Sequence, residues 1–382
     1  MGRDSMDDEQ KIDFWLLAIT MILAGIGLVM VYSSSMVISF AKFGSGTVYF
    51  KKQAIHIVIG FALMMILTKL NYRGFAKFGK FFLISGLGLL GVLLIQNQIN
   101  DFGVNRWLRI GSFSFQPSEI MKIVLIIFMA DSISRMGDKV RSFKEGFLPL
   151  TGIILLTFSL VFLEPDLGIA GLLLFIGFYI MFVGRAKIVH LLMIIMPALV
   201  SIVFLVKNVP YMKRRWVDFI NPEMAYQIKQ SIISIGSGGL MGVGLGNSSQ
   251  KNYFLPELHT DFVFSIFAEE LGFIGTSVLL ILTFFFVKRG LKIASQAPDL
   301  FGFLLASGLT MMIGIQVFVN IGVAIRLLPT TGMTLPFISY GGTSIVTSFA
   351  AVGILLNISK QGNYEMKLSR VFGARSFRKV WS

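Results

Sequence analysis

The chain has 382 residues, of which 55% are apolar and 14% charged, and its mean hydropathy is +0.77. A soluble domain of this length cannot bury so much apolar surface, so the composition indicates a polytopic membrane protein with a single membrane domain, residues 1–382. The absence of cysteine excludes disulfides and cysteine-ligated metals. The net charge of +14 lies mostly in short loops between apolar runs, which argues for the positive-inside pattern and against nucleic-acid binding.

Runs of about 20 apolar residues predict an all-α fold of about ten membrane-spanning helices. In chain order the expected spans are residues 12–34, 52–69, 75–95, 117–136, 147–163, 167–184, 187–206, 262–287, 301–325 and 336–358. The leader, residues 1–11, is acidic, and no cleavage site follows it, so the first span is expected to be retained. Lysine and arginine are more numerous in the loops on the side of the leader. Both termini, including the basic tail 360–382, are therefore predicted to be cytoplasmic.

The longest connection, residues 207–261 between the seventh and eighth spans, is predicted to be extracytoplasmic. It holds a basic cluster of Lys213, Arg214 and Arg215, an amphipathic stretch (226–235) and a glycine-rich stretch. A loop this long and this apolar is expected to be functional and to fold back on the membrane surface. The glycine-rich stretch matches neither phosphate-loop pattern, so we expect close backbone packing or a flexible re-entrant turn.

Carboxylates and a histidine gather where this connection enters the eighth span. The group comprises Glu257, His259 and Asp261, followed by Glu269 and Glu270. A partly desolvated carboxylate at this depth is suited to act as a general base, whereas the structural alternative is a cap on the following helix. A histidine-rich metal site is disfavoured because the zinc-type spacing is absent, but a Mg²⁺ or Mn²⁺ site with oxygen ligands stays open.

Other polar groups flank the fourth span. Glu119 and Lys122 lie three residues apart on one helix face, which predicts an internal ion pair or a Lys122 that holds a phosphate-bearing lipid. Arg106, Trp107 and Arg109 precede this span. Trp107 is expected in the membrane interface, and the arginines beside it can grip an anionic headgroup.

Two further segments lie on the outer side. Glu164 and Asp166 occupy a short turn, where exposed charge near the bilayer surface is the default interpretation. Residues 327–344 combine two prolines and several glycines with an apolar run, which predicts irregular backbone at membrane depth. Such backbone requires surrounding protein or water, so the outer side is expected to hold a polar cavity.

Together these motifs resemble the SEDS family (shape, elongation, division and sporulation), which includes FtsW, RodA and SpoVE. The matching motifs are Asn105-Arg106-Trp107, Gln116-Pro117-Ser118-Glu119 with Lys122, Glu164-Pro165-Asp166-Leu167-Gly168, Tyr226-Gln227, Gly244-Leu245-Gly246-Asn247-Ser248, residues 253–272 and Leu335-Pro336-Phe337-Ile338-Ser339-Tyr340-Gly341-Gly342. Loop details are similar to FtsW or SpoVE in preference to RodA, although the Asn221-Pro222 segment reaches Tyr226 sooner than is usual for FtsW.

The resemblance implies a peptidoglycan glycosyltransferase that polymerises lipid II at the outer face of the bacterial cytoplasmic membrane, in cell division or a related cell-wall process. It implies a class B penicillin-binding protein as partner, together with other divisome or elongasome membrane proteins. The catalytic acid of the family falls on Asp261, which leaves Glu269 and Glu270 as internal packing or hydrogen-bond partners. Other implicated positions fall on Trp107, the Glu119 and Lys122 pair, and Asp166.

The expected reaction is a single displacement with inversion, for which Asp261 is the base and the leaving pyrophosphate needs positive charge or a divalent cation. Candidate substrate-binding residues are Arg106, Trp107, Arg109, Glu119, Lys122, Asp166, Arg214, Arg215, Glu257, His259, Ser339 and Tyr340. A lipid II flippase is the main alternative, since broken helices and intramembrane charges are also typical of transporters, and a non-catalytic division scaffold is a third. The lack of a clear internal repeat and the gathering of acids on one side favour the enzyme.

Overall fold

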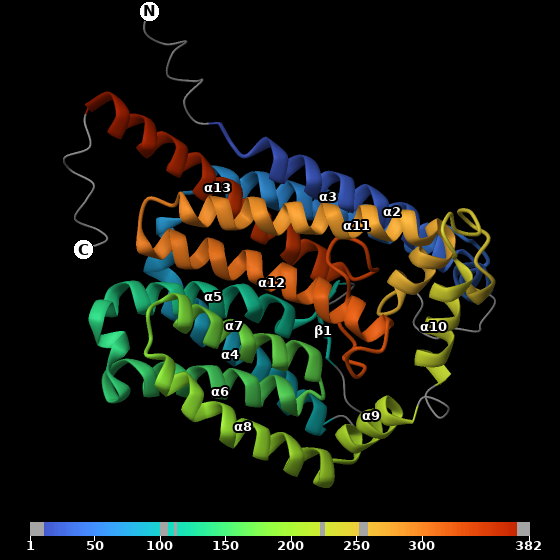
Figure 1. Cartoon of the computed structure of the whole chain (residues 1–382), viewed down its shortest axis with the longest axis horizontal. Helices are drawn as coiled ribbons and strands as arrows, with labels where there is room; N and C mark the ends of the chain where they lie inside the picture. Colours follow the sequence, from blue (N-terminus) through green and yellow to red (C-terminus); the bar gives the residue numbers. More distant parts are fainter. Residues whose placement is uncertain (1–10, 100–105, 111–112, 222–225, 252–258, 373–382) are drawn as a thin grey trace, which may run out of the picture.

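The computed structural model describes residues 11–99, 106–110, 113–221, 226–251 and 259–372. Within this part, ten helices follow the ten predicted spans, side by side in one bundle (Figure 1). They are α2 (Phe14–Phe43), α3 (Val48–Lys69), α4 (Arg73–Ile99), α5 (Pro117–Met136), α6 (Leu148–Leu163), α7 (Leu167–Val183), α8 (Ile188–Asn208), α11 (Val263–Ser295), α12 (Leu300–Ala324) and α13 (Gly342–Phe372). The predicted all-α fold is confirmed.

Seven helical stretches of the described chain are long and apolar enough to cross a membrane. Helix α7 is apolar but has only 17 residues. Helix α5 carries Glu119, Lys122 and Asp131 within its length, and these three side chains are buried against protein. Charged groups in a membrane are placed in this way, facing the interior of a bundle. The chain is a multi-pass membrane protein.

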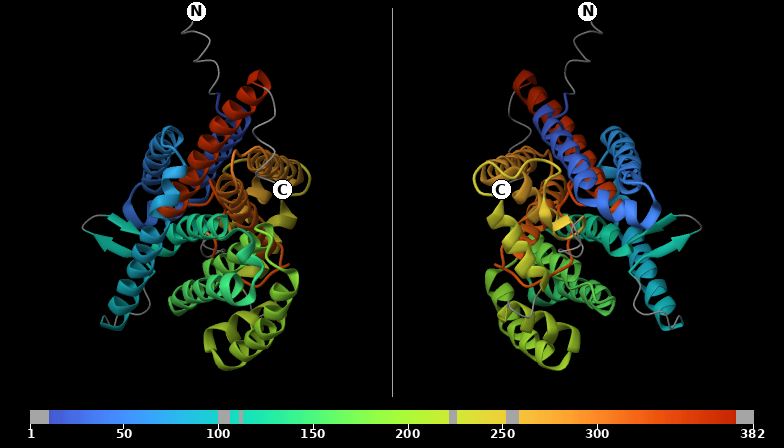
Figure 2. Two further views of the ribbon diagram at one scale, coloured as in Figure 1. Left: turned by 90° about the vertical axis from the view of Figure 1, so that its left-hand side faces the viewer. Right: turned by 90° about the vertical axis from the view of Figure 1, so that its right-hand side faces the viewer.

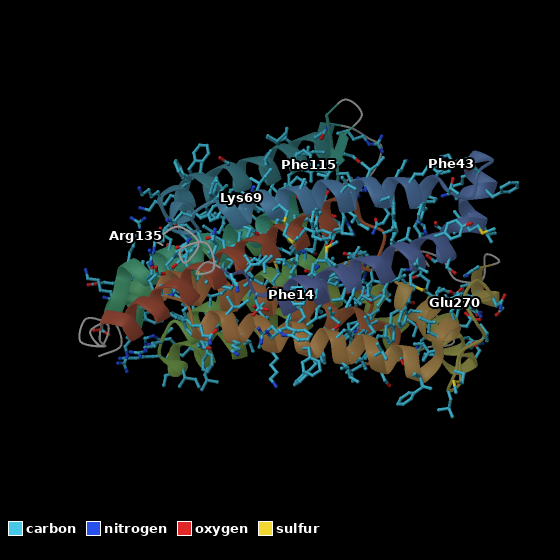
Figure 3. The ribbon with its side chains drawn as sticks, turned by 90° about the horizontal axis from the view of Figure 1, so that it is seen from above. Phe14, Phe43, Lys69, Phe115, Arg135 and Glu270 are labelled. Atoms are coloured by element: carbon cyan, nitrogen blue, oxygen red, sulfur yellow. The ribbon has the colours of Figure 1, made fainter. Side chains whose placement is uncertain are left out.

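Successive helices run in opposite directions. In Figure 3, Lys69 at the end of α3 and Arg135 near the end of α5 lie at one end of the bundle, whereas Phe43 and Glu270 lie at the other. We call the end with Phe43 and Glu270 the loop end, because the connections after α8 and α12 gather there (Figure 1). Helix α12 is central, in contact with α5, α7, α11 and α13, and the end views in Figure 2 show it enclosed between the two halves of the bundle.

The predicted boundaries differ from the structure at the last span. The span was expected at 336–358, but α13 begins only at Gly342, and residues 325–341 form a non-helical segment that we call the α12–α13 loop. A proline can occupy the first turn of a helix, as Pro117 does in α5, but Phe337 has φ +66°, which is not helical, so the helix begins only after this residue. Helix α2 instead continues beyond its predicted end to Phe43, and α11 continues to Ser295.

The predicted long connection contains two short helices, α9 (Pro210–Ile220) and α10 (Tyr226–Ser237), and α10 covers the amphipathic stretch. The glycine-rich stretch that follows packs backbone to backbone against a break in α11. Phe273 N donates to Gly239 O (2.9 Å), and Gly272 at the break has φ +64°. A Cβ on Gly272 would clash with Gly242 N, and one on Gly242 would clash with Glu270 O, so close backbone packing, one of the two predicted alternatives, explains these two glycines.

Glu269 and Glu270, directly before this break, are internal hydrogen-bond partners, as predicted. Glu269 Oε2 accepts from Ser234 Oγ at 2.9 Å, and Glu269 Oε1 accepts from the backbone N and the hydroxyl of Ser249 at 3.0 Å each. Glu270 is fully buried and forms an ion pair with the buried Lys251. These contacts attach the glycine-rich stretch to α11.

Candidate active site

A cavity of about 230 Å³ lies at the loop end, where α5, α7 and α11 begin and the α12–α13 loop crosses them. Its described lining comprises Arg106, Trp107, Gln116, Glu119, Ile169, Thr260, Asp261, Gly332, Met333, Thr334, Tyr340, Gly341 and Ser344. Polar and apolar side chains from four distant parts of the sequence meet here. The polar cavity predicted beside the irregular backbone is present.

Asp261 and two arginines converge on one point of the cavity wall. A Cβ built on Gly332 would lie 3.6 Å from Asp261 Oδ2, 3.8 Å from Arg106 Nη1 and 3.9 Å from Arg215 Nη2. Gly332 has φ +75°, a conformation that favours glycine, so the absence of a side chain leaves this space open between the charges. The N-cap position of α11 is Phe262, which disfavours the interpretation of Asp261 as a helix cap.

The backbone at residues 259–261 is held through three consecutive carbonyls. The donors, in order, are Tyr340 N (2.8 Å), Ser339 Oγ (2.6 Å) and Asn320 Nδ2 (2.9 Å). Two of these donors belong to the α12–α13 loop and one to α12, so both elements orient the segment that carries Asp261. The Ser339 hydroxyl donates to the backbone of Thr260, and Ser339 lies outside the described lining of the cavity. Its predicted contact with substrate therefore stays a prediction.

Asp166 orients two side chains of the cavity without lining it. It is buried at the start of α7, where Oδ1 accepts from Ile169 N at 3.2 Å. Its Oδ2 accepts from Gln116 Nε2 at 2.8 Å and lies 4.0 Å from Arg106 Nη1. Arg106 also donates to Pro165 O at 2.6 Å. The turn between α6 and α7 therefore holds Arg106 at the cavity. The prediction that the charges of this turn are exposed is wrong for Asp166, which is buried.

The predicted basic cluster is divided between two faces of α9. Arg215 donates to Thr330 O, and its Cζ lies 4.5 Å from the centre of the Tyr211 ring. Arg214 and Lys213 are exposed. Of the cluster, only Arg215 lies beside Gly332, and it is outside the described lining of the cavity.

The residues predicted around the fourth span are also divided. Trp107 and Glu119 line the cavity, whereas Arg109 is exposed in the short strand β1 (Leu108–Ile110), which pairs with β2 (Phe113–Phe115). Lys122 Nζ lies 2.7 Å from Glu119 Oε2, with both side chains at least 95% buried. The predicted internal ion pair is therefore present at the base of the cavity.

His259 and Tyr340 both pack against Tyr49 of α3, His259 at a tilt and Tyr340 edge to face. The ring centres of His259 and Tyr340 lie 4.8 and 5.1 Å from that of Tyr49. Tyr340 lines the cavity, so this aromatic group forms part of its edge. Glu257 and Asn105 lie outside the described residues.

Burial raises the pKa values of the two acids in the α6–α7 turn, Glu164 and Asp166. Glu164 is fully buried, and in the described part of the chain neither carboxylate oxygen has a hydrogen-bond partner. Burial raises its pKa to about 8, with a further increase from Asp166 that Arg106 opposes. Burial likewise raises the pKa of Asp166 and lowers the pKa of Arg215. At neutral pH Glu164 is therefore mostly a neutral acid beside the charged site.

Glu164→Gln is expected to flatten the pH dependence of thermal stability. The folded-state pKa of Glu164, about 8, lies above the ordinary value of 4.5, so its stabilisation is full below pH 4.5 and is lost as pH rises through 8. The variant should match wild type at pH 5 and show a higher Tm by a few degrees at pH 8.5, measured by scanning fluorimetry. Glu145→Gln, at an exposed carboxylate, is the control and should change neither value. Parallel wild-type and Glu164→Gln curves would contradict the raised pKa.

No group of three or more histidine, aspartate or glutamate side chains that could hold a metal occurs among the described residues. The groups next to Asp261 are the guanidinium groups of Arg106 and Arg215, which repel a cation and attract an anion. The cavity thus provides its own positive charge, and the divalent cation stays a prediction.

Among the residues of the site that were not sequence-based candidates, three contribute to the geometry described above. Gln116 was seen only as part of a motif, and Gly332 carries no functional group of its own. Asn320 had a detectable signal, because an amide inside the apolar span 301–325 must find hydrogen-bond partners in the protein.

Comparisons with known proteins agree over most of the chain. The sequence profile of a family described as "Cell cycle protein", FtsW/RodA/SpoVE, matches residues 14–364. Stage V sporulation protein E of Bacillus subtilis is 39% identical over 363 residues, 92% of this chain and 98% of the relative. Probable peptidoglycan glycosyltransferase FtsW of Geobacter sulfurreducens is 38% identical over 356 residues, 92% and 95% of the two chains.

Two solved structures are similar as well. One belongs to a peptidoglycan synthase complex studied for its coordination of polymerization and crosslinking, with a TM-score of 0.77, 28% identity and coverage of 92% of this chain and 98% of that chain. The other is the rod shape determining protein RodA of Thermus thermophilus, with a TM-score of 0.67, 27% identity and coverage of 92% and 97%.

Proposed function

The chain belongs to the family of cell cycle proteins that includes FtsW, RodA and SpoVE, and we propose that it is a peptidoglycan glycosyltransferase that polymerises lipid II. The observation that carries the proposal is the convergence of Asp261, Arg106 and Arg215 around Gly332 in the cavity. A carboxylate that accepts a proton and cations that receive an anionic leaving group are the two requirements of this reaction.

In the proposed reaction, a hydroxyl oxygen of the acceptor sugar forms a bond to the anomeric carbon of the donor. Asp261 takes the proton of that hydroxyl, and the bond from the anomeric carbon to the pyrophosphate breaks, so the pyrophosphate leaves with the electron pair. Arg106 and Arg215 are positioned to bind its negative charge. A single displacement of this kind inverts the anomeric centre.

The lining residues place the cavity at the loop end, and α2 starts toward the opposite end of the bundle (Figure 1). With the N-terminus in the cytoplasm, as the loop charges predict, the site faces the outer leaflet of the bacterial cytoplasmic membrane, where lipid II is consumed. The proposed partner is a class B penicillin-binding protein that crosslinks the new strand. The similarity to a synthase complex that couples polymerization and crosslinking supports it. Other divisome or elongasome membrane proteins are proposed as further partners, and the similarity to FtsW and SpoVE favours a role in division or sporulation.

Purified protein incubated with lipid II, with and without the partner and with and without EDTA, tests this proposal. Glycan strands resolved on a gel are the expected product. Movement of lipid II across vesicle membranes with no polymer formed would instead support the flippase and overturn the enzyme. Loss of strands only with EDTA would establish a divalent cation as a requirement.

Arg215→Ala is expected to lower the polymerisation rate about 10²-fold, because one preorganised donor at a developing charge is worth this much. Arg214→Ala is the matched control, since Arg214 neighbours it on α9 but is exposed, and it should stay within about twofold of wild type. Initial rates of strand formation at low and moderate salt provide the measurement. Equal losses in the two variants would mean that α9 contributes only a diffuse positive potential.

A further inference from the structure

Asn320 lies in the last turns of α12, only 2% exposed within a helix that is otherwise mostly apolar. Its amide nitrogen donates both hydrogens, one to Asp261 O at 2.9 Å and one to Met333 O at 2.7 Å. The side-chain oxygen has no donor among the described residues. In the described chain Asn320 therefore bonds to two backbone carbonyls, one directly before α11 and one in the α12–α13 loop.

These two carbonyls belong to two separate segments that line the cavity. Asp261 carries the proposed base, and Met333 follows Gly332, the point on which the base and the two arginines converge. Helix α12 is packed against α5, α7, α11 and α13, so the position of Asn320 is defined by the bundle rather than by either loop. One amide therefore joins the segment that carries the base to the neighbouring segment of the α12–α13 loop.

We propose that Asn320 is a positioning residue for Asp261, which holds the base and the α12–α13 loop in the register needed for proton transfer. The inference rests on the proposed function. Asn320 touches no reacting atom in this arrangement, since both bonds go to backbone oxygens. Its loss should therefore reduce the rate of the chemical step and leave substrate binding almost unchanged, because a displacement of about 1 Å can cost about 10²-fold in rate.

The chain contains a matched control at the other end of the bundle. Asn357 of α13 is 3% exposed, donates to Thr68 O at 2.8 Å and accepts from Tyr72 N at 3.0 Å. It is also a buried amide that joins two elements through their backbones, but it lies far from the cavity. A variant at Asn357 therefore shows how the loss of two such hydrogen bonds affects the stability of the fold without a change at the cavity.

The test compares Asn320→Leu with Asn357→Leu, in which leucine has nearly the shape of asparagine but no donor. Both variants should unfold at lower temperature, because each leaves buried backbone groups without partners. Only Asn320→Leu should lose kcat for lipid II polymerisation, by about 10²-fold, with KM within about twofold of wild type. If Asn320→Leu does not fold, Asn320→Ser keeps one donor and should show an intermediate kcat at unchanged KM.

Several results would overturn the inference. A kcat of folded Asn320→Leu equal to that of Asn357→Leu would make Asn320 a structural residue only. A raised KM at unchanged kcat would assign Asn320 to substrate binding. Both outcomes leave the base intact, whereas full activity of an Asp261→Asn variant in the same assay would remove the proposed function of the site itself.

Discussion

Asp261→Asn is expected to abolish strand formation while the protein stays folded. Asparagine has nearly the same shape as aspartate, so the backbone bonds at residues 259–261 remain, but its amide cannot accept the proton of the attacking hydroxyl. General base catalysis typically contributes about 10²- to 10⁴-fold, and a loss in this range is predicted for the polymerisation rate. Gel analysis of strands made from lipid II by the purified variant provides the measurement.

Asp218→Asn is the control for this experiment, because it removes a carboxylate from α9 at the same end of the bundle without touching the described lining of the cavity. It should retain wild-type activity, and both variants should keep the wild-type Tm to within a few degrees. Normal polymerisation by Asp261→Asn would exclude Asp261 as the base and leave the neighbouring acids of the α6–α7 turn as the alternatives.

Lys122→Met is expected to have the largest effect on stability. Glu119 is 4% exposed and 2.7 Å from Lys122 Nζ, and its other described side-chain contact is a bond from Thr347 Oγ1 at 3.2 Å. Removal of the lysine leaves a buried carboxylate without its counter-ion, which costs about 3–5 kcal/mol. Unfolding in denaturant, followed by tryptophan fluorescence in detergent, should show a loss of this size.

The double variant Lys122→Met with Glu119→Gln separates the two interpretations of this pair. It removes both charges, so most of the lost stability should return. If the pair only fixes helix packing, polymerisation should return as well, whereas a stable but inactive double variant would support a contact between Lys122 and a lipid phosphate. Lys139→Met is the control, since its partner Glu145 is 62% exposed, and it should change stability by less than about 1 kcal/mol.

The helices could be predicted because each apolar run must be long enough to cross the hydrocarbon and each buried backbone must bond within its own segment. The same reasoning failed at the start of α13, where hydropathy continues through residues 336–341 but Phe337 has a non-helical backbone conformation (φ +66°). It also failed for Glu164 and Asp166, which were expected to be exposed in a turn and are buried. Whether a charge in a short turn faces water depends on the neighbouring helices, which hydropathy does not describe.

For the predicted site residues, the sequence could identify the chemical type of each side chain but not the direction in which it points. Arg214 and Arg215 are adjacent and identical, yet one is exposed and the other donates to Thr330 O beside Gly332. Glu119 and Lys122 were predicted to pair because three residues separate neighbours on one helix face. Asn320 bonds with Asp261 and Met333 across sequence separations that no local pattern encodes.

The sequence alone determined that this protein is a helical, multi-pass membrane protein, because lipid imposes length, apolarity and internal hydrogen bonding on each span separately. The resemblance of its motifs to the FtsW, RodA and SpoVE family made Asp261 the leading candidate for the base. Only the tertiary structure decided which charges surround Asp261. Arg106, Arg215 and Gly332 come from three separate connections that meet at the loop end. That arrangement depends on how the helices pack against one another, a set of contacts between residues far apart in the chain.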